Sequence, residues 1–457
     1  MGDDRPILTA AETRAAEAAL FAAGISVDAL MALAGAAVAD AAWRFAGPVP
    51  TLVLCGPGNN GGDGYVVAAE LKARGVSVRV AASGEPGTDA ARAARARWGG
   101  PVETLADARP ASLLIDGLFG TGLTRALAPE IAAALTRLAA AARHRVAIDL
   151  PSGVATDSGA LFGEVPAFDI TVALGALKPA HLLLPAAGRC GRVVVGDIGL
   201  DTGAATLRAI GRPRLAAPGP QDHKYSRGKV AVVAGAMAGA AALAAGAAMR
   251  AAGYVELIGG EQHGSPRALV RRPWTAKALD DPRIGAVVVG PGLGRDRAGR
   301  MRLDAALAAG KPLVLDADAL VLIGRSRHDR LAGHVLTPHR GEFDRLFGAG
   351  EGDRLARARA AAAQSRAIIL LKGADSIVAH PDGRAAMAPI APSWLASAGT
   401  GDVLAGIVGA MLAGGRAPFD AAQAALWLHA DAARRAGPAL IADDLAAHLP
   451  AALAACL

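Results

Sequence analysis

Apolar residues are distributed along this chain in short blocks that alternate with longer amphipathic stretches. Residues 8–46 begin the chain with apolar positions at helical spacing, among them Leu20, Leu30 and Val38. Short apolar blocks and further helical patterns then follow one another. The predicted strands are 51–55, 76–81, 112–116, 145–150, 169–174 and 192–196, and the helices between them include 88–98 and 129–142. This βα alternation predicts an α/β protein with a mostly parallel, doubly wound sheet.

The alternating pattern is interrupted at residues 201–222, where prolines and glycines cluster. A second α/β series starts at 229–233. Its predicted strands are 284–289, 312–315, 334–337, 367–371 and 376–379, and its predicted helices are 240–252, 298–309, 353–364, 402–414 and 418–436. We therefore expect an N-terminal domain over residues 1–212, a linker at 213–222 and a second domain over residues 223–457.

Small residues dominate the composition. Of the 457 residues, 53% are hydrophobic but only 4% are aromatic, so the core must pack largely through alanine, glycine and aliphatic side chains. The net charge of +7 comes from 48 basic and 41 acidic residues, and it is spread as isolated arginines without a lysine-rich tract. We interpret this charge as solvated surface with affinity for phosphorylated small molecules, and we expect no nucleic-acid partner.

The cysteines and the apolar segments indicate the cellular compartment of the protein. Cys55, Cys190 and Cys456 are far apart and outside any CxxC spacing, which argues against a disulfide framework or a zinc site. The first residues are polar and lack the pattern of a signal peptide. Residues 231–252 are apolar but are interrupted by Arg250, which favours a buried loop and helix over a membrane span. We expect a cytoplasmic protein with no membrane partner.

The most distinctive motif is the glycine-rich segment GPGNNGGDG at residues 56–64, between a predicted strand and a helical pattern that starts at Tyr65. Strand, glycine loop and helix is the arrangement that points backbone N–H groups at an anion. The segment is neither a GxxxxGK[ST] phosphate loop nor a GxGxxG dinucleotide fingerprint. Its Asn and Asp side-chain oxygens could bind a cation, so the loop could hold both a phosphate and a cation. The alternative is a turn without a ligand, which five glycines in nine residues disfavour because each glycine costs conformational entropy.

Two further predicted strands end in carboxylates. Asp116 follows Leu-Leu-Ile and leads into a second glycine-containing loop, and Asp149 follows Val-Ala-Ile and leads into Pro151-Ser152-Gly153. Because ligands bind outside the carboxyl ends of strands in open parallel sheets, we expect both carboxylates to share a crevice with the first loop. A single strand-terminal Asp is more often a helix cap or turn former. Two of them beside a polar glycine loop favour a ligand site.

These motifs occur together in a known family. GPGNNGGDGY, DGLFGTGL, AIDLPSG and the Ala-Leu-Lys-Pro that includes Lys178 resemble, over about residues 1–210, the epimerase domain of NAD(P)H-hydrate repair enzymes. That family interconverts the R and S epimers of hydrated NADH or NADPH at C6 of the nicotinamide ring. The resemblance implies that Asp149 meets the reacting ring, where a carboxylate can move a proton as the hydroxyl leaves and returns.

The same resemblance implies the ligand contacts of this domain. The nicotinamide hydrate would be lined by Asn59, Asn60, Gly61, Gly62 and Asp63. The substrate phosphates would be contacted by Gly120, Thr121, Gly122, Leu123, Thr124, Arg125 and Ala126. A potassium ion would be held by Asn60, Asp116 and Ser152, whose oxygens are hard ligands suited to such a cation.

In the second half, the strongest motif is GTGD at residues 399–402, where a glycine turn starts a helix with Asp402 in its first turn. Backbone N–H groups in such a turn can hold a phosphate in flight while the carboxylate takes a proton from a hydroxyl. The alternative is a capped helix in which Asp402 only complements the helix dipole. Further motifs end other predicted strands, namely GPGLG at 290–294, DADAL at 316–320, TPHRGE at 337–342 and KGADS at 372–376.

Together these motifs resemble, over about residues 220–457, the ADP-dependent dehydratase domain of the same enzymes, a branch of the ribokinase-like superfamily. The resemblance implies Asp402 as the general base. It implies that the S hydrate is contacted by Ala240, Gly294, His339 and Asp402. It implies that the adenine nucleotide is contacted by Lys372, Gly373, Ala374, Asp375, Ser376 and Gly401. The chain departs from the family pattern at 235–240, where a glycine-rich segment is one residue shorter and less polar.

The sequence therefore predicts a bifunctional NAD(P)H-hydrate repair enzyme with an N-terminal Rossmann-like three-layer domain and a C-terminal ribokinase-like α/β domain. It would epimerise the hydrates of NADH and NADPH, called NADHX and NADPHX. It would dehydrate the S form with ADP, which becomes AMP and phosphate. We expect potassium in the epimerase site, magnesium with ADP, and a homo-oligomer. Two alternatives are a ribokinase-like vitamin-precursor kinase with an accessory domain and a non-catalytic nucleotide sensor. A phosphorylated product would favour the kinase, and the presence of Asp116, Asp149 and Asp402 argues against the sensor, because a pure binder need not keep all three.

Overall fold

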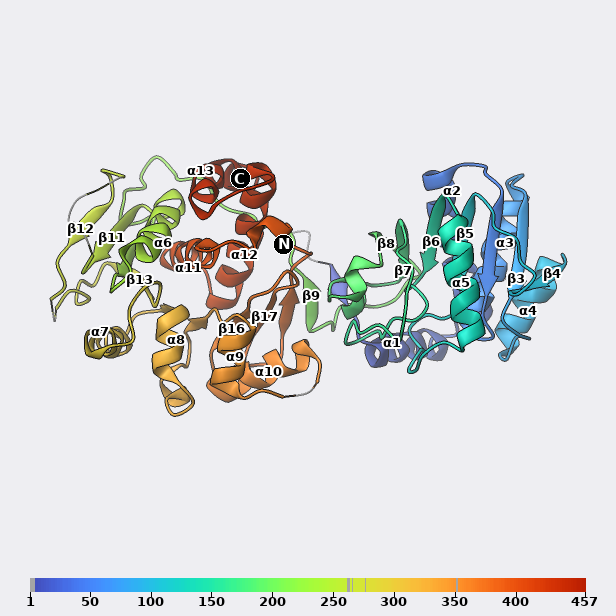
Figure 1. Ribbon diagram of the computed structural model, residues 1–457, viewed down its shortest axis with the longest axis horizontal. Coiled ribbons are helices and arrows are strands. Elements are labelled where there is room, and N and C mark those ends of the chain that lie inside the picture. Colours follow the sequence, from blue (N-terminus) through green and yellow to red (C-terminus); the bar gives the residue numbers. More distant parts are fainter. Residues whose placement is uncertain (1–4, 261–263, 265, 276, 351) are drawn as a thin grey trace. The chain divides into compact units, whose positions relative to one another are not determined.

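The computed structural model describes residues 5–457 except 261–263, 265, 276 and 351. The described chain forms two compact units, Arg5–Ala205 and Thr206–Leu457, which are considered separately. Residues 207–209, which the sequence assigned to the first domain, form a strand of the second unit's sheet and pair with residues 385–387. The predicted α/β architecture with parallel sheets is confirmed in both units (Figure 1).

The N-terminal unit contains a seven-stranded sheet in the order β4-β3-β2-β5-β6-β7-β8, and its neighbouring strands are parallel. Its strands are β2 (Thr51–Cys55), β3 (Val78–Ala82), β4 (Val102–Thr104), β5 (Leu113–Gly117), β6 (His144–Ile148), β7 (Ile170–Leu174) and β8 (Arg192–Gly196). The remaining elements are β1 (Pro6–Ile7), α1 (Ala10–Ala22), α2 (Val27–Ala46), α3 (Asn59–Ala73), α4 (Asp89–Trp98), α5 (Pro129–Ala141), η1 (Pro179–His181) and η2 (Ala186–Gly188).

Helices cover both faces of this sheet because its central strands are apolar on both sides. In β2, Val53 and Cys55 pack with residues of α2, α3 and α4, whereas Leu52 and Leu54 pack with residues of α5. Strands buried on both faces read as continuous apolar runs, which is how β2 could be recognised in the sequence. The result is the expected three-layer arrangement, with the carboxyl ends of β2, β5 and β6 adjacent at one edge.

Helix α2 is long and apolar enough to cross a membrane, judged by length and composition alone. A core helix passes the same test, and α2 buries Leu30, Ala34 and Val38 in the cluster it shares with the sheet. Its apolar character is therefore explained by packing on one side. The expectation of a protein without a membrane partner stays a prediction.

The second unit contains a larger sheet with the order β9-β18-β17-β16-β15-β14-β13-β10-β11-β12. Its strands are β9 (Leu207–Ala209), β10 (Lys229–Val233), β11 (Tyr254–Ile258), β12 (Val270–Arg272), β13 (Ile284–Val289), β14 (Leu313–Leu315), β15 (Val335–Leu336), β16 (Ile368–Leu371), β17 (Ile377–Ala379) and β18 (Ala385–Met387). The strands from β12 to β16 are parallel, and β17 is antiparallel to both of its neighbours.

Helices surround this sheet. They are α6 (Ala238–Ala251), α7 (Arg297–Ala308), α8 (Ala317–Ile323), α9 (Arg340–Phe347), α10 (Arg354–Ser365), α11 (Thr400–Ala413), α12 (Pro418–Ala436) and α13 (Ala442–Ala454), with short 3-10 helices η3 (His328–Arg330) and η4 (Ser393–Leu395). Helices α6, α11, α12 and α13 share one core cluster with the sheet, and α7 to α10 lie away from this group (Figure 1).

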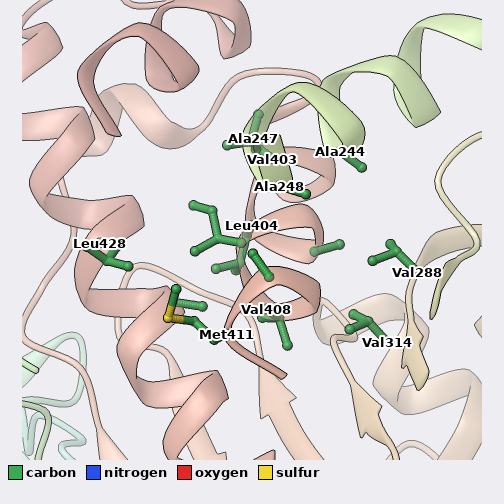
Figure 2. Close-up of a cluster of buried hydrophobic side chains, with 14 of the residues drawn as sticks. Ala244, Ala247, Ala248, Val288, Val314, Val403, Leu404, Val408, Met411 and Leu428 are labelled. Carbon is green, nitrogen blue, oxygen red and sulfur yellow. The ribbon is translucent and has the colours of Figure 1, made fainter. Parts of the chain in front are cut away.

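The core of the second unit shows how a chain poor in aromatic residues packs. Alanines of α6 meet Val403, Leu404 and Val408 of α11 over the sheet (Figure 2). The two helices approach so closely that a Cβ on Gly406 would lie 2.0 Å from the carbonyl oxygen of Ala244. Small side chains therefore allow α11 to pack directly against the α6 backbone, and this contact holds the first turn of α11 in place.

Two candidate active sites

The glycine-rich segment of the N-terminal unit is largely helical. Helix α3 starts at Asn59, with Gly58 as its N-cap, so the helix begins six residues earlier than the pattern suggested. A Cβ on Gly61 would lie 1.9 Å from the carbonyl oxygen of Gly56, and one on Gly62 would lie 2.5 Å from the Met31 side chain. These glycines are thus required by close packing inside the protein. Their contact with the nicotinamide hydrate stays a prediction.

Asp149 is held in an unusual position directly after β6. Its φ angle is +63°, which only a few residue types adopt readily, Asp and Asn among them. Its side chain is buried, and its Oδ1 atom accepts hydrogen bonds from Lys178 Nζ at 2.5 Å and from the Leu174 N–H at 3.2 Å. Lys178 Nζ also donates to the Leu174 carbonyl at 2.7 Å. One carboxylate oxygen is therefore fully engaged, and the other, Oδ2, faces away from this network.

His181 supports the same residue. Its Nε2 lies 2.7 Å from the carbonyl oxygen of Asp149, and its Nδ1 accepts the N–H of Lys178 at 2.9 Å. The first contact requires a donor and the second an acceptor, so the ring is the neutral Nε2–H tautomer. Burial and the Lys178 charge lower the pKa of His181 to about 4, which agrees with a neutral ring. The network fixes both the backbone and one carboxylate oxygen of Asp149.

Gly120 connects Asp149 with the start of α3. A Cβ on Gly120 would lie 2.8 Å from Oδ1 of Asn60 and 3.4 Å from Oδ2 of Asp149. Two predicted site residues from distant parts of the chain thus converge on the backbone of a third. The residues that follow, from Thr121 to Ala126, form a largely exposed loop beside them, and none is buried. This loop is open to a ligand.

Asp116, in β5, and Ser152, in the loop after β6, form a buried hydrogen-bonded pair. Neither side chain is exposed to solvent. Asp116 accepts from the Ser152 hydroxyl at 2.7 Å and from the backbone N–H groups of Ser152 and Leu118 at 2.9 and 3.1 Å. The Asn60 amide nitrogen is buried without a hydrogen-bond partner among the described residues. Burial outweighs these bonds and raises the pKa of Asp116, so a cation beside it would help to keep the carboxylate ionised.

The second unit presents its acidic residues at the start of α11. The N-cap is Gly399 with a φ angle of +86°, a conformation that favours glycine, and Asp402 lies in the first turn, half-buried. Burial and the nearby Asp316 carboxylate together raise the pKa of Asp402 to about 7, against the opposing effect of Lys372. A carboxylate with that pKa can accept a proton near neutral pH. The Thr400 hydroxyl donates to Leu395 and Ser397 carbonyls, which ties this turn to the preceding loop.

Lys372 brings a cation to the same turn. Its Nζ atom would lie 3.4 Å from a Cβ on Gly401, and it donates to Oδ1 of Asp316 at 2.6 Å. Asp316 precedes α8 as its N-cap residue but makes no capping hydrogen bond with its side chain. Its buried carboxylate instead positions a lysine from 56 residues away in the chain. The segment after Lys372 turns on itself, since Ser376 Oγ accepts from the Gly373 N–H at 3.1 Å.

The other predicted residues of this unit lie around two loops. The N–H of Gly294 donates to Asp318 at 3.0 Å, and Gly292 packs against Ala240, so the shortened 235–240 segment rests on the 290–294 loop. His339 is the N-cap of α9, and its Nδ1 accepts the Gly341 N–H at 3.0 Å. Its side chain is 60% exposed.

Four residues outside the predicted site set share these clusters. Lys178 and His181 hold Asp149, Asp316 holds Lys372, and Glu17 of α1 interacts electrostatically with Asp149. Lys178 lies in a quoted motif, and Asp316 ends a predicted strand, so both carried a sequence signal. Glu17 carried none, because an acidic residue on an amphipathic helix normally faces solvent.

Comparison with known proteins identifies relatives of both units. A family model described as NAD(P)H-hydrate dehydratase matches residues 230–453, and one described as YjeF-related protein N-terminus matches residues 27–180. The bifunctional NAD(P)H-hydrate repair enzyme Nnr of Mycobacterium tuberculosis is 38% identical over 386 residues, covering 81% of this chain and 80% of its own. Those of Gloeobacter violaceus and Mycobacterium leprae are 38% and 34% identical, and the aligned regions cover 93% and 99% of this chain and 92% and 100% of theirs.

A solved structure is also similar to the second unit. It is an ADP/ATP-dependent NAD(P)H-hydrate dehydratase from Bacillus subtilis, co-crystallised with ATP and Mg2+. It is 29% identical, covers 53% of this chain and 95% of its own, and superposes with a TM-score of 0.47.

Proposed function

This chain belongs to the family of bifunctional NAD(P)H-hydrate repair enzymes, and we propose on that premise that each of the two clusters carries one of the family's reactions. The protein repairs hydrated NADH and NADPH by epimerising their R and S forms and dehydrating the hydrate. The predicted identity is confirmed, and the kinase and sensor alternatives are set aside.

The epimerase reaction is assigned to the cluster around Asp149. The observation that carries this assignment is the convergence of Asp149 Oδ2 and Asn60 Oδ1 on Gly120, while Asp149 Oδ1 is bound to Lys178. A carboxylate with one oxygen fixed and the other presented to the site is oriented for proton transfer. The nicotinamide hydrate would lie against this oxygen and the Asn59–Asp63 turn, with its phosphates along the exposed loop from Gly120 to Ala126.

A potassium ion would be held in this unit by Asn60, Asp116 and Ser152. Amide, carboxylate and hydroxyl oxygens form a donor set that suits a hard cation, and the buried Asp116 carboxylate gains from a neighbouring positive charge. When bound, the ion would supply positive charge close to the substrate. In this assignment the hydrogen bonds between Asp116 and Ser152 fix the positions of these two ligands in the cation site.

The dehydratase reaction is assigned to the first turn of α11. Asp402 accepts the proton of the C6 hydroxyl, and the hydroxyl oxygen attacks the terminal phosphorus of ADP, which leaves AMP. The C6–O bond then breaks with loss of phosphate as the lone pair of the ring nitrogen forms a C6–N double bond. Loss of a proton from C5 then forms the C5–C6 double bond and restores the dihydronicotinamide. The turn's N–H groups and Lys372 stabilise the charge on the phosphate in flight.

Adenine nucleotide would extend from this turn over the segment from Lys372 to Ser376, and the S hydrate would be contacted from Ala240, Gly294 and His339. Magnesium ions usually bind through substrate phosphates and one or two carboxylates. Asp316, Asp318 and Glu342 all raise the pKa of Asp402, and these four carboxyl groups outnumber Lys372 and Arg295, the cations paired with Asp316 and Asp318. This excess negative charge fits a nucleotide that arrives as its magnesium complex.

Location and assembly also remain proposals. Cys55, Cys190 and Cys456 are buried free thiols, which fits a reducing cytoplasm. A homo-oligomer stays a prediction, which light scattering on the purified protein would test.

The function is tested with purified protein, both NADHX epimers, ADP, magnesium and potassium. We expect recovery of NADH, followed by its absorbance, until both epimers are consumed. Recovery of half the material would indicate that only the S form is used. An absence of NADH would contradict the assignment.

Gly120→Ala tests the geometry of the epimerase cluster. The added Cβ would lie 2.8 Å from Asn60 and push it or Asp149 out of place, so we expect the epimerase rate to fall about a hundredfold. Dehydration of the S form should be unchanged, because it belongs to the other unit. Gly84→Ala is the matched control, since Gly84 is exposed outside the site and a Cβ there meets nothing within 4 Å. Equal rates for both variants would refute the proposed contact.

The pH dependence of dehydration tests Asp402 as a base. Its pKa is raised to about 7, and only the ionised form can accept the hydroxyl proton. We therefore expect kcat/KM to fall tenfold per pH unit below about pH 7 and to level off above it. The measurement uses the S epimer at several pH values with saturating ADP. A profile that stays flat down to about pH 5 would exclude this role.

A further inference from the structure

Asp63 is a buried carboxyl group that the proposed chemistry does not yet use. It lies in the second turn of α3 with 7% of its surface exposed. Among the described residues, its side chain makes no hydrogen bond and no ion pair. A buried carboxyl group without a partner destabilises a fold, so its presence calls for an explanation.

The groups that interact electrostatically with Asp63, or with its neighbour Asp149, come from separate parts of the chain. Asp149 follows β6, Glu17 belongs to α1, Cys55 ends β2, and Lys178 is bound to Asp149. Burial, together with the Asp149 and Glu17 carboxylates, raises the pKa of Asp63 well above its usual range. Asp149 has the opposite environment, because its Oδ1 is bound to the Lys178 ammonium and to a backbone N–H. Two neighbouring carboxyl groups are thus held in different environments, one with a cation and one without.

We propose that Asp63 is a second catalytic residue of the epimerase site and acts as the acid to Asp149 as the base. The proposal rests on the assignment of Asp149 to the reacting ring. It goes beyond that assignment by giving the two faces of C6 separate proton-transfer groups. Paired carboxyl groups in contrasting environments are a general arrangement for acid and base roles in one site.

In the R to S direction, C6 loses its hydroxyl group before it gains a new one. The C6–O bond breaks as Asp63 donates its proton, and the hydroxyl leaves as water. The lone pair of the ring nitrogen forms a C6–N double bond. Water then adds to the opposite face of C6, the π electrons return to nitrogen, and Asp149 accepts the proton of the added water. Asp63 is now ionised and Asp149 protonated, which is the state required for the reverse reaction with the roles exchanged.

Oxygen exchange tests the bond that breaks. The full-length protein is mixed with the R epimer in H2(18)O without ADP, so that dehydration does not occur, and the S product is analysed by chromatography and mass spectrometry. We expect one solvent oxygen in each newly formed S molecule, after subtraction of the rate without protein. S product that keeps its original oxygen would overturn the proposal, because it would require cleavage of the C6–N bond instead.

Asp63→Asn tests the residue. We expect kcat for epimerisation to fall at least about a hundredfold with little change in KM, because the amide has the same shape but no acidic proton. Asp149→Asn is measured beside it. If Asp149→Asn stays active, the proposed function of the cluster fails; if only Asp63→Asn stays active, this inference fails and the assignment of Asp149 stands.

Glu17→Gln gives a readout that a purely structural role would not change. Removing this half-buried carboxylate removes one of the charges that keep Asp63 protonated, so the pKa of Asp63 should fall. The rate needs the protonated acid, and its decline at high pH should therefore move to lower pH in this variant. A decline at the same pH in wild type and variant would contradict the proposed role of Asp63.

Discussion

Replacement of Asp402 by Asn should abolish the recovery of NADH from the S hydrate while the R and S forms continue to interconvert. Asn keeps the shape of the side chain and its place in the first turn of α11 but cannot accept the hydroxyl proton. Loss of a general base lowers a rate by about 10²- to 10⁴-fold, and we expect the upper part of that range. The measurement is NADH absorbance with the S epimer, ADP and magnesium.

This loss should not arise from unfolding. The folded-state pKa of Asp402 is raised, so its ionised form opposes folding at neutral pH, and Asn removes that unfavourable charge. The variant should therefore unfold at the same temperature as wild type or slightly above it. Asp420→Asn, in the exposed first turn of α12, is the matched control and should keep full activity. A dehydratase rate for Asp402→Asn within a few-fold of wild type would exclude Asp402 as the base.

Replacement of Asp149 by Asn should have the converse effect and leave the R epimer unused. The amide tolerates the left-handed backbone conformation at φ +63°, so the turn after β6 is kept. It removes the oxygen charge that faces Gly120 and Asn60. We expect epimerisation to fall by at least about a hundredfold. Starting from an equal mixture of epimers with ADP, half of the NADH should form quickly and the rest only at the uncatalysed rate.

Stability must be checked for this variant, because Lys178 would remain buried without its anion. Breaking a buried ion pair on one side costs about 3–5 kcal/mol. Circular dichroism and the melting temperature would detect such a loss, and Asp149→Asn combined with Lys178→Met would relieve it. Asp89→Asn on the exposed surface of α4 is the matched control. Rapid consumption of the R epimer by a folded Asp149→Asn protein would rule out the proposed role.

Much of the fold could be read from the chain because parallel strands buried on both faces leave a simple pattern. β2, β10 and β13 are largely apolar and buried, and each was predicted with the bounds that the structure shows. Shorter strands such as β4 and β12 were missed, because three residues with mixed polarity carry no period. The single helical region predicted for residues 8–46 is two helices, and α2 begins after a Ser26 cap that was not recognised.

The glycine-rich segment at residues 56–64 shows which features of a loop cannot be predicted from its local sequence. Its composition indicated a special backbone, and its position after a strand indicated a helix start. The purpose of each glycine was not accessible, because Gly56 and Gly61 are required by atoms of Leu118 and Gly56 that approach them only in the folded protein. Gly58, by contrast, has open space around it. Glycine thus meets a packing requirement at two of these positions, whereas the third has room for a side chain.

The sequence by itself determined the α/β class, the ends of the main strands and the motifs that identify the family. These follow from periodicity and from short segments, in which neighbouring residues interact through the local backbone. Only the tertiary structure decided which charges act on one another: Lys178 on Asp149, Asp316 on Lys372, and Glu17 on Asp63. The physical reason is that the pKa of a carboxyl group depends on burial and on charges a few ångströms away, and the fold brings those charges from distant parts of the chain.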